Sequence, residues 1–157
     1  MLTHTVSVPH IVDTVLPILQ EHSPQAVWLF ANDPDFESSS SSSSPAGTPA
    51  PGTAKQLIDA FHASGFVVFF QVGTVKDARK AVEDGADVIV AQGVDAGGHQ
   101  LARGSGVVSL VPEVVDMVER EFEPKGREVV VVAAGGVADG RGVAAAVGLG
   151  EFFPFFF

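Results

Sequence analysis

One stretch of the sequence places an ionisable side chain among flexible residues at the end of an apolar run. Residues 92–100 read QGVDAGGHQ and follow the mostly apolar run 86–91. The ordinary pKa of histidine is about 6.5, so the neutral imidazole of His99 can accept a proton. Gly97 and Gly98 allow a flat ligand to approach the backbone. The stretch predicts either a general base beside a ligand or a surface-loop histidine without a catalytic task.

A second candidate site is the glycine pair Gly135–Gly136, which directly follows the apolar run 128–134 (EVVVVAA). The N–H groups of such glycines can approach an anion, and the amino end of a following helix adds positive potential. The same pattern is also typical of a tight turn between a strand and a helix. A phosphate-binding loop and a plain turn are therefore both open.

Several other kinds of chemistry find no support in the sequence. The chain has no cysteine, which excludes disulfides, thiolate ligands and a cysteine nucleophile. No HExxH motif or cluster of histidines and carboxylates is present, so we predict no metal site. Asp95 is interpreted as a loop-capping or Asx-turn residue rather than a catalytic one. The net charge of -10 disfavours nucleic acid and anionic membranes as partners.

Four short apolar runs alternate with helix-like segments. The runs are rich in Val, Ile and Phe, which is typical of strands covered on both faces; they span 26–31, 66–72, 86–91 and 128–134. Helical patterns with cap and stop residues occupy 9–22, 53–65, 74–85, 112–122 and 142–149, and Pro17 is expected to kink the first.

This alternation predicts an α/β fold with a parallel sheet. The second and third runs begin about twenty residues apart, a spacing typical of barrels, and about four βα units form a partial (β/α)8 TIM barrel. An open four-stranded sheet is the alternative. In both folds ligands bind at the carboxyl ends of the strands, where Gln71, Gln92 and Gly135 lie.

The chain divides into four parts by composition. Residues 1–37 form a first helix–strand unit, and 54–150 hold the remaining βα units. Residues 38–53, which begin with seven serines, are expected to be a disordered Ser/Pro/Gly-rich loop, and 151–157 (EFFPFFF) form an aberrant Phe-rich tail. No secretory signal is visible, and no apolar stretch approaches the roughly 18 residues that span a bilayer. We therefore expect a cytoplasmic protein.

Two of these stretches together resemble a known family. Residues 85–99 (GADVIVAQGVDAGGH) followed by 131–142 (VVAAGGVADGRG) are similar to the nitronate monooxygenases, formerly called 2-nitropropane dioxygenases. The stretch QVGT at 71–74 also fits the pattern of that family. The resemblance covers most of 54–150 and is weaker over 3–34.

The resemblance implies an FMN-dependent barrel that oxidises alkyl nitronates, and in some members nitroalkanes, with molecular oxygen. It implies that His99 is the general base and that Gly135 and Gly136 hold the FMN phosphate. The other positions that it implies for flavin binding are Gln71, Gln92, Gly97 and Gly98.

The chain also departs from the family pattern. It resembles the fourth to seventh βα units of the barrel, without the first three and without the last. The exposed edges of such a partial barrel are expected to favour self-association. A truncated, non-catalytic remnant of the family is one alternative, and another FMN-binding or phosphate-binding barrel oxidoreductase is a second.

Overall fold

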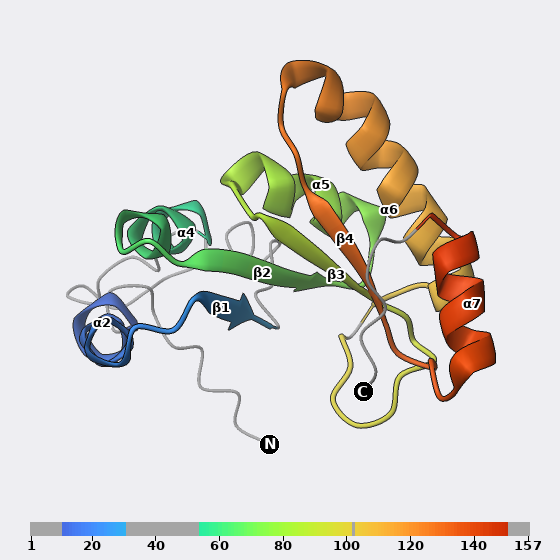
Figure 1. Ribbon diagram of the computed structural model, residues 1–157, viewed down its shortest axis with the longest axis horizontal. Coiled ribbons are helices and arrows are strands. Elements are labelled where there is room, and N and C mark those ends of the chain that lie inside the picture. Colours follow the sequence, from blue (N-terminus) through green and yellow to red (C-terminus); the bar gives the residue numbers. More distant parts are fainter. Residues whose placement is uncertain (1–10, 31–53, 102, 151–157) are drawn as a thin grey trace, which may run out of the picture.

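The four predicted strands form one parallel sheet (Figure 1). The computed structural model describes residues 11–30, 54–101 and 103–150. Its strands lie in chain order, each parallel to the next: β1 (Ala26–Leu29), β2 (Val67–Val72), β3 (Val88–Gln92) and β4 (Val130–Ala134). Consecutive βα units in a barrel wall have this sequential order, whereas a doubly wound sheet reverses its strand order. The predicted loop 38–53 and the Phe-rich segment 151–157 lie outside the described residues.

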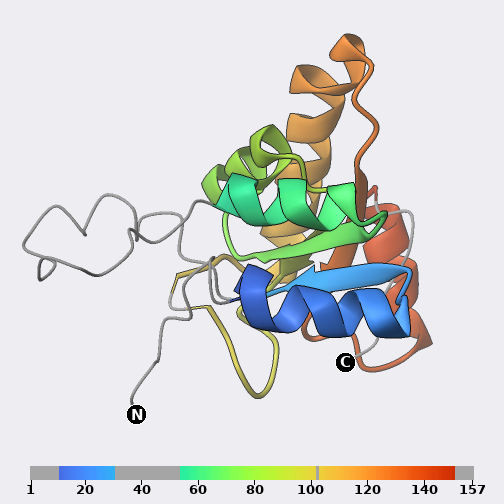
Figure 2. The same cartoon turned by 90° about the vertical axis from the view of Figure 1, so that its left-hand side faces the viewer.

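Helices connect the strands, as the alternating pattern predicts. They are η1 (Ile11–Val15), α2 (Leu16–His22), α4 (Ala54–Ala63), α5 (Val75–Asp84), α6 (Val107–Glu121), the short η2 (Glu123–Lys125) and α7 (Gly140–Gly148). Figure 2 shows α2 and α4 side by side at one end of the sheet. Among the described residues, no helix is both long enough and apolar enough to cross a membrane.

The predicted limits of α5 are confirmed by its caps. The Thr74 hydroxyl accepts a hydrogen bond from the Asp77 amide at the start of the helix, over 3.1 Å. Gly85 ends the helix with a φ of 116°, a conformation that favours glycine. Thr53, the predicted cap of the preceding helix, lies outside the described residues.

Other helix limits differ from the predicted ones. The helix expected at 112–122 begins at Val107, and Pro112 lies inside it. One lost backbone hydrogen bond is outweighed there because Leu110, Val111 and Val114 are buried in the core. Pro17 lies at the start of α2, where the chain changes from a π-helical to an α-helical segment, rather than at a kink within one helix.

One face of the sheet packs against α4, α5 and α6. Strand residues such as Val68 and Ile89 join helix residues such as Leu57, Ile58 and Val114 in the main hydrophobic core. Each of these five side chains is at most 1% exposed. Burial of one such side chain stabilises the fold by about 1.5 to 3 kcal/mol. This core fixes the direction of the strands and therefore the position of their carboxyl ends.

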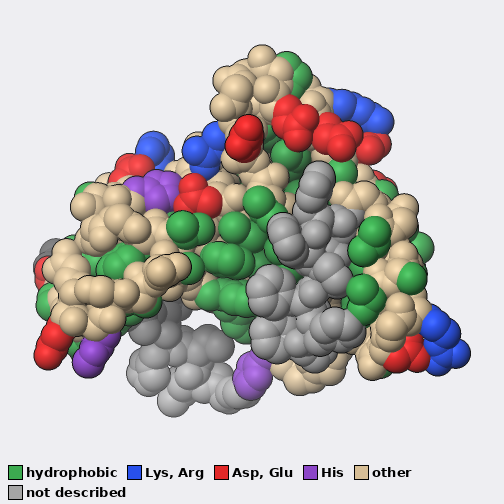
Figure 3. Space-filling view, in the orientation of Figure 1, with side chains coloured by type: hydrophobic (Ala, Val, Ile, Leu, Met, Phe, Trp, Pro, Cys, Tyr) green, Lys and Arg blue, Asp and Glu red, His purple; other side chains and the backbone are tan. Residues whose placement is uncertain are grey.

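The opposite face carries side chains in rows, because paired residues of parallel strands point to the same side. The first row is Trp28, Phe69, Val88 and Val130, the second is Gln71, Val90 and Val132, and the third is Gln92 and Ala134. The Trp28 and Phe69 rings stack with their centroids 5.7 Å apart. In Figure 3, hydrophobic side chains gather over the sheet in the middle of this face.

The two halves of the sheet are not equally covered on this face. Val90 and Val132 are 0% and 1% exposed, whereas Trp28, Val67 and Val130 are about 40% exposed (39%, 42% and 40%). The prediction of strands covered on both faces therefore holds for the middle of β3 and β4 and is wrong for β1 and β2. The described helices lie against the other face of those two strands.

An ion pair between α5 and α6 gives the fold a dependence on pH. The Nε and Nη2 atoms of Arg79 donate to the two carboxylate oxygens of Glu121, over 2.8 and 2.9 Å. The hydrogen bond from Arg79 lowers the pKa of Glu121 below its ordinary value of 4.5. The pKa of Glu121 is lower in the folded chain than in the unfolded chain, so the pair stabilises the fold fully at pH values above the unfolded-state pKa. Its contribution is lost as pH falls through the folded-state pKa.

We expect Glu121→Gln to lower the free energy of unfolding more near neutral pH than at about pH 3. The effect will be small, because the two side chains are 39% and 40% exposed and solvent screens the pair. Urea unfolding at low salt and both pH values measures the difference. Glu119→Gln, an exposed position on the same helix, is the control. An equal loss at both pH values for Glu121→Gln would contradict the prediction.

Candidate functional site

Three loops meet at the carboxyl ends of β2, β3 and β4. The β3–α6 loop runs from Gly93 to Gly106, and the Ser105 amide in it donates to the Gly73 carbonyl after β2, over 3.1 Å. On its other side, a Cβ added to Gly135 after β4 would lie 2.8 Å from the Ala96 Cβ. In Figure 1 this loop lies beside the connection between β4 and α7. The predicted meeting of these loops at one edge of the sheet is confirmed.

The β3–α6 loop is closed on itself by backbone hydrogen bonds. The Val94 amide donates to the Ser105 carbonyl over 3.0 Å, and the Ala96 amide donates to the Gly93 carbonyl over 3.1 Å. The Gly93 amide donates to the Ala134 carbonyl over 2.9 Å and continues the pairing of β3 with β4. The base of the loop is therefore closed on itself and tied to the end of β4.

His99 lies on the exposed part of this loop. The Nε2 of Gln92 donates to the His99 carbonyl over 3.1 Å, and the Nε2 of Gln100 donates to the Ala96 carbonyl. Within the described part of the chain, the His99 imidazole makes no hydrogen bond or ion pair. The backbone of His99 is thus held by the protein, while its ring is available to a ligand.

Gln71 and Gln92 form the polar end of an otherwise apolar face. Gln71 lies in the second row of side chains, and Gln92 lies in the third. The Gln71 Oε1 accepts a hydrogen bond from the Trp28 Nε1–H over 2.9 Å. Gln71 is therefore oriented by β1, and Gln92 is oriented by the His99 loop.

Gly97 and Gly98 face open space. A Cβ on either residue would have no neighbour within 4 Å, and Gly98 has a φ of 72°. The backbone of this segment can therefore be approached by a ligand without obstruction, as the sequence predicts.

Gly135 and Gly136 are packed tightly on one side against the neighbouring loop. Their φ values are 88° and 78°. A Cβ on Gly136 would lie 2.8 Å from the Asp95 Cβ, so both glycines are required for contact with the neighbouring loop. Neither amide donates a hydrogen bond to a described residue. Two adjacent N–H groups without acceptors suit the oxygens of an anion such as a phosphate.

The amino end of α7 does not add an open anion site beside the glycine pair, in contrast to the prediction from the sequence. The Asp139 Oδ1 accepts hydrogen bonds from the Arg141 and Gly142 amides at the start of the helix, over 2.9 and 3.3 Å. The hydrogen bond from the Arg141 side chain, followed by these amides, lowers the pKa of Asp139. A carboxylate thus occupies the end of the helix, and the amides of Gly135 and Gly136 are not part of this cap.

The hydrogen bonds of two residues near the site, Trp28 and Asp95, were not predicted from the sequence. Trp28 sits in an unbroken apolar run, and its link to Gln71 depends on the pairing of β1 with β2. Asp95 was interpreted as a cap, which is confirmed: its Oδ2 accepts a hydrogen bond from the Val107 amide over 2.7 Å. The helix that it caps begins twelve residues later and could not be named from local sequence.

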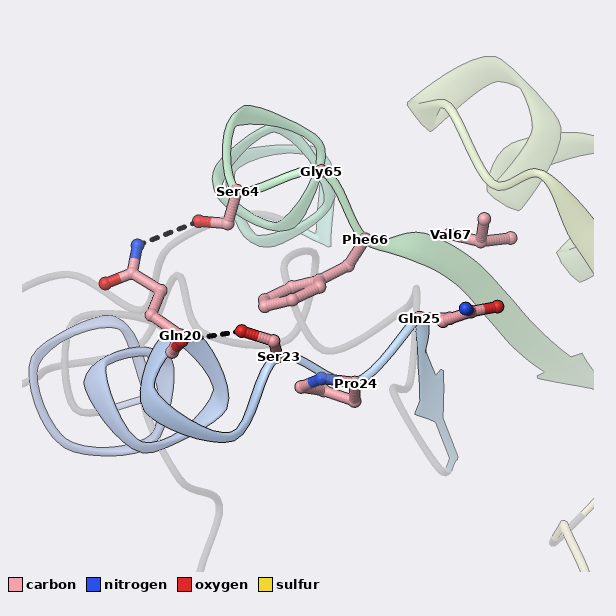
Figure 4. A pocket seen from close by; sticks show the side chains of 8 residues that line it. All are labelled: Gln20, Ser23, Pro24, Gln25, Ser64, Gly65, Phe66 and Val67. Carbon is pink, nitrogen blue, oxygen red and sulfur yellow. Dashed lines mark hydrogen bonds between the residues drawn. The ribbon is translucent and has the colours of Figure 1, made fainter.

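A cleft of about 530 Å³ lies away from this site, at the amino ends of β1 and β2 (Figure 4). The Gln20 Nε2 donates to the Ser64 Oγ across it, over 3.0 Å. Its lining carries no ionisable side chain and consists of Gln20, Ser23, Pro24, Gln25, Ser64, Gly65, Phe66 and Val67. His99 and the amides of Gly135 and Gly136, which have no described acceptor, are at the other edge of the sheet, and that edge is the candidate functional site.

Comparison with known sequences gives the family. The family model for nitronate monooxygenase matches residues 46–151. The nitronate monooxygenase of Neurospora crassa is 77% identical over 150 residues, which cover 96% of this chain and 38% of that protein. The chain belongs to the nitronate monooxygenase family. Nitronate monooxygenase npaC of Metarhizium robertsii is 33% identical, over 88% of this chain and 34% of its own length.

Solved structures agree with the fold. The M276A mutant of FabK from Thermotoga maritima has a TM-score of 0.65 and 27% identity, over 90% of this chain and 38% of that one. Nitroalkane oxidase from Streptomyces ansochromogenes has a TM-score of 0.60 and 26% identity, over 88% and 35%. A mandelate oxidase mutant with a monooxide FMN adduct has a TM-score of 0.52 and 28% identity, over 68% and 32%.

The fold is therefore an α/β fold with four parallel βα units of a (β/α)8 TIM barrel. This chain spans 38% of the length of its Neurospora relative, which agrees with the expected partial copy.

The packing of the glycine pair leads to a prediction about stability. We expect Gly135→Ala to lower the free energy of unfolding by about 2 to 4 kcal/mol, because the new Cβ combines a positive φ with overpacking. Gly140→Ala is the matched control, since a Cβ there has no neighbour within 4 Å. Urea unfolding of both variants measures the difference. A loss for Gly135→Ala no larger than that of the control would show that the two loops do not pack as described.

Proposed function

We propose that this chain carries the base and phosphate-binding part of an FMN-dependent enzyme that oxidises alkyl nitronates or nitroalkanes with molecular oxygen. The observation that supports this most is the contact between two loops. The loop that carries His99 packs against Gly135 and Gly136, whose amides have no described acceptor. A proton acceptor and an anion cradle on neighbouring strands suit a phosphorylated cofactor and a weakly acidic substrate.

The residues of the chain fit FMN in part. The amides of Gly135 and Gly136 would hold the phosphate, and the open backbone at Gly97 and Gly98 would allow the flat ring to approach. Gln71 and Gln92 lie on the same face of the sheet, on the neighbouring strands β2 and β3, and would hydrogen-bond the ring. Bound FMN would supply the acceptor for the substrate electrons and pass them to oxygen. The FMN adduct of the structurally similar mandelate oxidase supports this choice of cofactor.

His99 would act on the substrate carbon. In a nitroalkane the carbon beside the nitro group carries an acidic hydrogen, and a neutral imidazole nitrogen can accept that proton while the electron pair stays on the nitronate. An alkyl nitronate has already lost this proton. The base is therefore required for nitroalkanes and dispensable for nitronates.

We expect His99→Asn to abolish nitroalkane oxidation while retaining FMN binding and most of the oxidation of preformed nitronates. General-base catalysis contributes a factor of about 10² to 10⁴, which sets the size of the loss. Oxygen consumption with each substrate, and flavin absorbance of the purified chain, are the measurements. His22→Asn, an exposed histidine of α2, is the control. Equal turnover of nitroalkane by His99→Asn and the unchanged chain would remove His99 from the mechanism.

The same experiment separates the alternatives. A chain that stays colourless after incubation with FMN would be a non-catalytic remnant of the family. A chain that binds FMN but consumes no oxygen with nitronates would be a different barrel oxidoreductase. The cytoplasmic location stays a prediction, which cell fractionation tests.

We also propose that the chain self-associates through its sheet. Trp28, Val67 and Val130 are large apolar side chains, each about two-fifths exposed (39%, 42% and 40%), on the face that the described helices leave uncovered. β1 and β4 each pair with only one described strand. Unpaired strand edges beside an apolar face favour association with another chain.

We expect Val130→Lys to shift the chain toward monomer in sedimentation velocity and to weaken any blue shift of tryptophan emission at high protein concentration. Trp28 is the single tryptophan of the sequence, so its emission reports on this face. Val147→Lys is the control, because Val147 is 55% exposed on α7 and not on the sheet. A chain that is monomeric over the whole concentration range would contradict the proposal.

A further inference from the structure

We propose that Asp95 is a positioning residue, which holds the His99 loop in place between the amino end of α6 and the Gly135–Gly136 loop. The catalytic meaning of this inference rests on the proposed function. Its structural meaning rests only on contacts among the described residues.

The Asp95 carboxylate caps a helix that has no cap of its own. Gly106 occupies the N-cap position of α6 and makes no side-chain hydrogen bond. The Asp95 Oδ2 accepts a hydrogen bond from the amide of Val107, the first residue of the helix, over 2.7 Å. A carboxylate at the positive end of a helix makes a charge-assisted hydrogen bond. Asp95 therefore ties the start of the β3–α6 loop to its end.

The carboxylate is enclosed by backbone on two sides. A Cβ on Gly93 would lie 2.9 Å from the Asp95 Oδ2 and 2.5 Å from the Val107 amide nitrogen, and a Cβ on Gly106 would lie 3.4 Å from the same oxygen. Glycine at 93 is thus what allows the carboxylate to reach the helix. Asp95 itself remains exposed to solvent, so the hydrogen bond to Val107 is what fixes its carboxylate.

The other side of Asp95 contacts the next loop. A Cβ on Gly136 would lie 2.8 Å from the Asp95 Cβ, and one on Gly135 would lie 2.8 Å from both the Ala96 Cβ and the Gly93 carbonyl oxygen. The turn 93–96 therefore fills the space beside the glycine pair. Asp95 is at once the cap of α6 and part of the surface against which the proposed phosphate loop packs.

The position of His99 depends on this turn. The residues that follow it are held by two side-chain hydrogen bonds, from Gln100 to the Ala96 carbonyl and from Gln92 to the His99 carbonyl. The first of these has its acceptor on the turn that Asp95 anchors. If the turn moves, the loop loses a fixed base, and His99 is displaced relative to Gly135 and Gly136.

The structural test uses the full chain, labelled with ¹⁵N, without any cofactor. We expect Asp95→Ala to speed hydrogen exchange of the Val107 amide at least about tenfold and to move the Gly97, Gly98 and His99 amide signals toward unstructured positions. Asp95→Asn should restore both, since an amide oxygen can still accept from Val107. Thr74→Ala is the matched control, because it removes another N-cap, that of α5.

Unchanged signals at residues 97–99 in Asp95→Ala would overturn the proposal, as would equal changes in Thr74→Ala. If Asp95→Ala does not fold, Asp95→Ser decides, because its hydroxyl is one bond shorter than the carboxylate that accepts from Val107: faster exchange at Val107 and residues 97–99, without change at α5, supports the proposal. Uniform exchange across the chain, or none, overturns it.

The kinetic test uses the FMN-loaded chain. We expect Asp95→Ala to lower kcat for nitroalkanes by about 10- to 100-fold, a size typical of a misplaced catalytic group, and to lower nitronate oxidation less. Asp95→Asn should recover most of this loss. If the chain binds no FMN, the proposed function fails while the exchange experiment still decides the role of Asp95. If FMN binds and the two substrates are affected equally, Asp95 acts only on stability.

Discussion

The site depends on one close contact, in which the backbone of Gly135 and Gly136 meets the turn 93–96 that follows β3. Added Cβ atoms on the two glycines would come within 2.8 Å of Ala96 and Asp95, so the contact exists only because both residues lack side chains. Their positive φ values turn the chain away from β4 at this point. The loop that carries His99 and the loop of the glycine pair are therefore in direct contact, although His99 and Gly135 are 36 positions apart along the chain.

Carboxylates satisfy the helix ends around this unit. Asp95 accepts from the first amide of α6, and Asp139 accepts from two amides at the start of α7. An anion at either helix terminus would meet a negative side chain already in place. The amides of the glycine pair are outside both caps and donate to none of the described residues. The two helices are thus capped by the protein itself, without a bound anion.

On the apolar face of the sheet, polar side chains are found only near the carboxyl ends of the strands. Its first row is entirely apolar, and glutamine side chains appear only in the rows nearer the carboxyl ends. Gln71 is oriented by Trp28 of β1, and Gln92 is oriented by the His99 carbonyl. Polar groups therefore gather where a ligand would bind, and the rest of the face is suited to packing. The exposure of Trp28 and Val130 leaves part of that packing surface open to a partner.

The sequence by itself determined the class of the fold, the order of its elements and the edge of the sheet at which the candidate loops meet. Strands of Val, Ile and Phe separated by capped helices specify parallel βα units, and the carboxyl ends of such strands necessarily share an edge. Local patterns also located the caps at Thr74 and Gly85, because a cap is an interaction between near neighbours. Family membership followed from two motifs whose residues are contiguous.

Only the tertiary structure decided which distant groups meet. The capping of α6 by Asp95, the orientation of Gln71 by Trp28 and the packing of the glycine pair join residues far apart in sequence. The start of α6 at Val107 also depended on burial of its first turns, because Pro112 by itself predicts a helix that begins at residue 112. Local sequence records which conformations each residue can adopt. Which distant residues come into contact depends on how the elements pack together, and this cannot be read from any one segment.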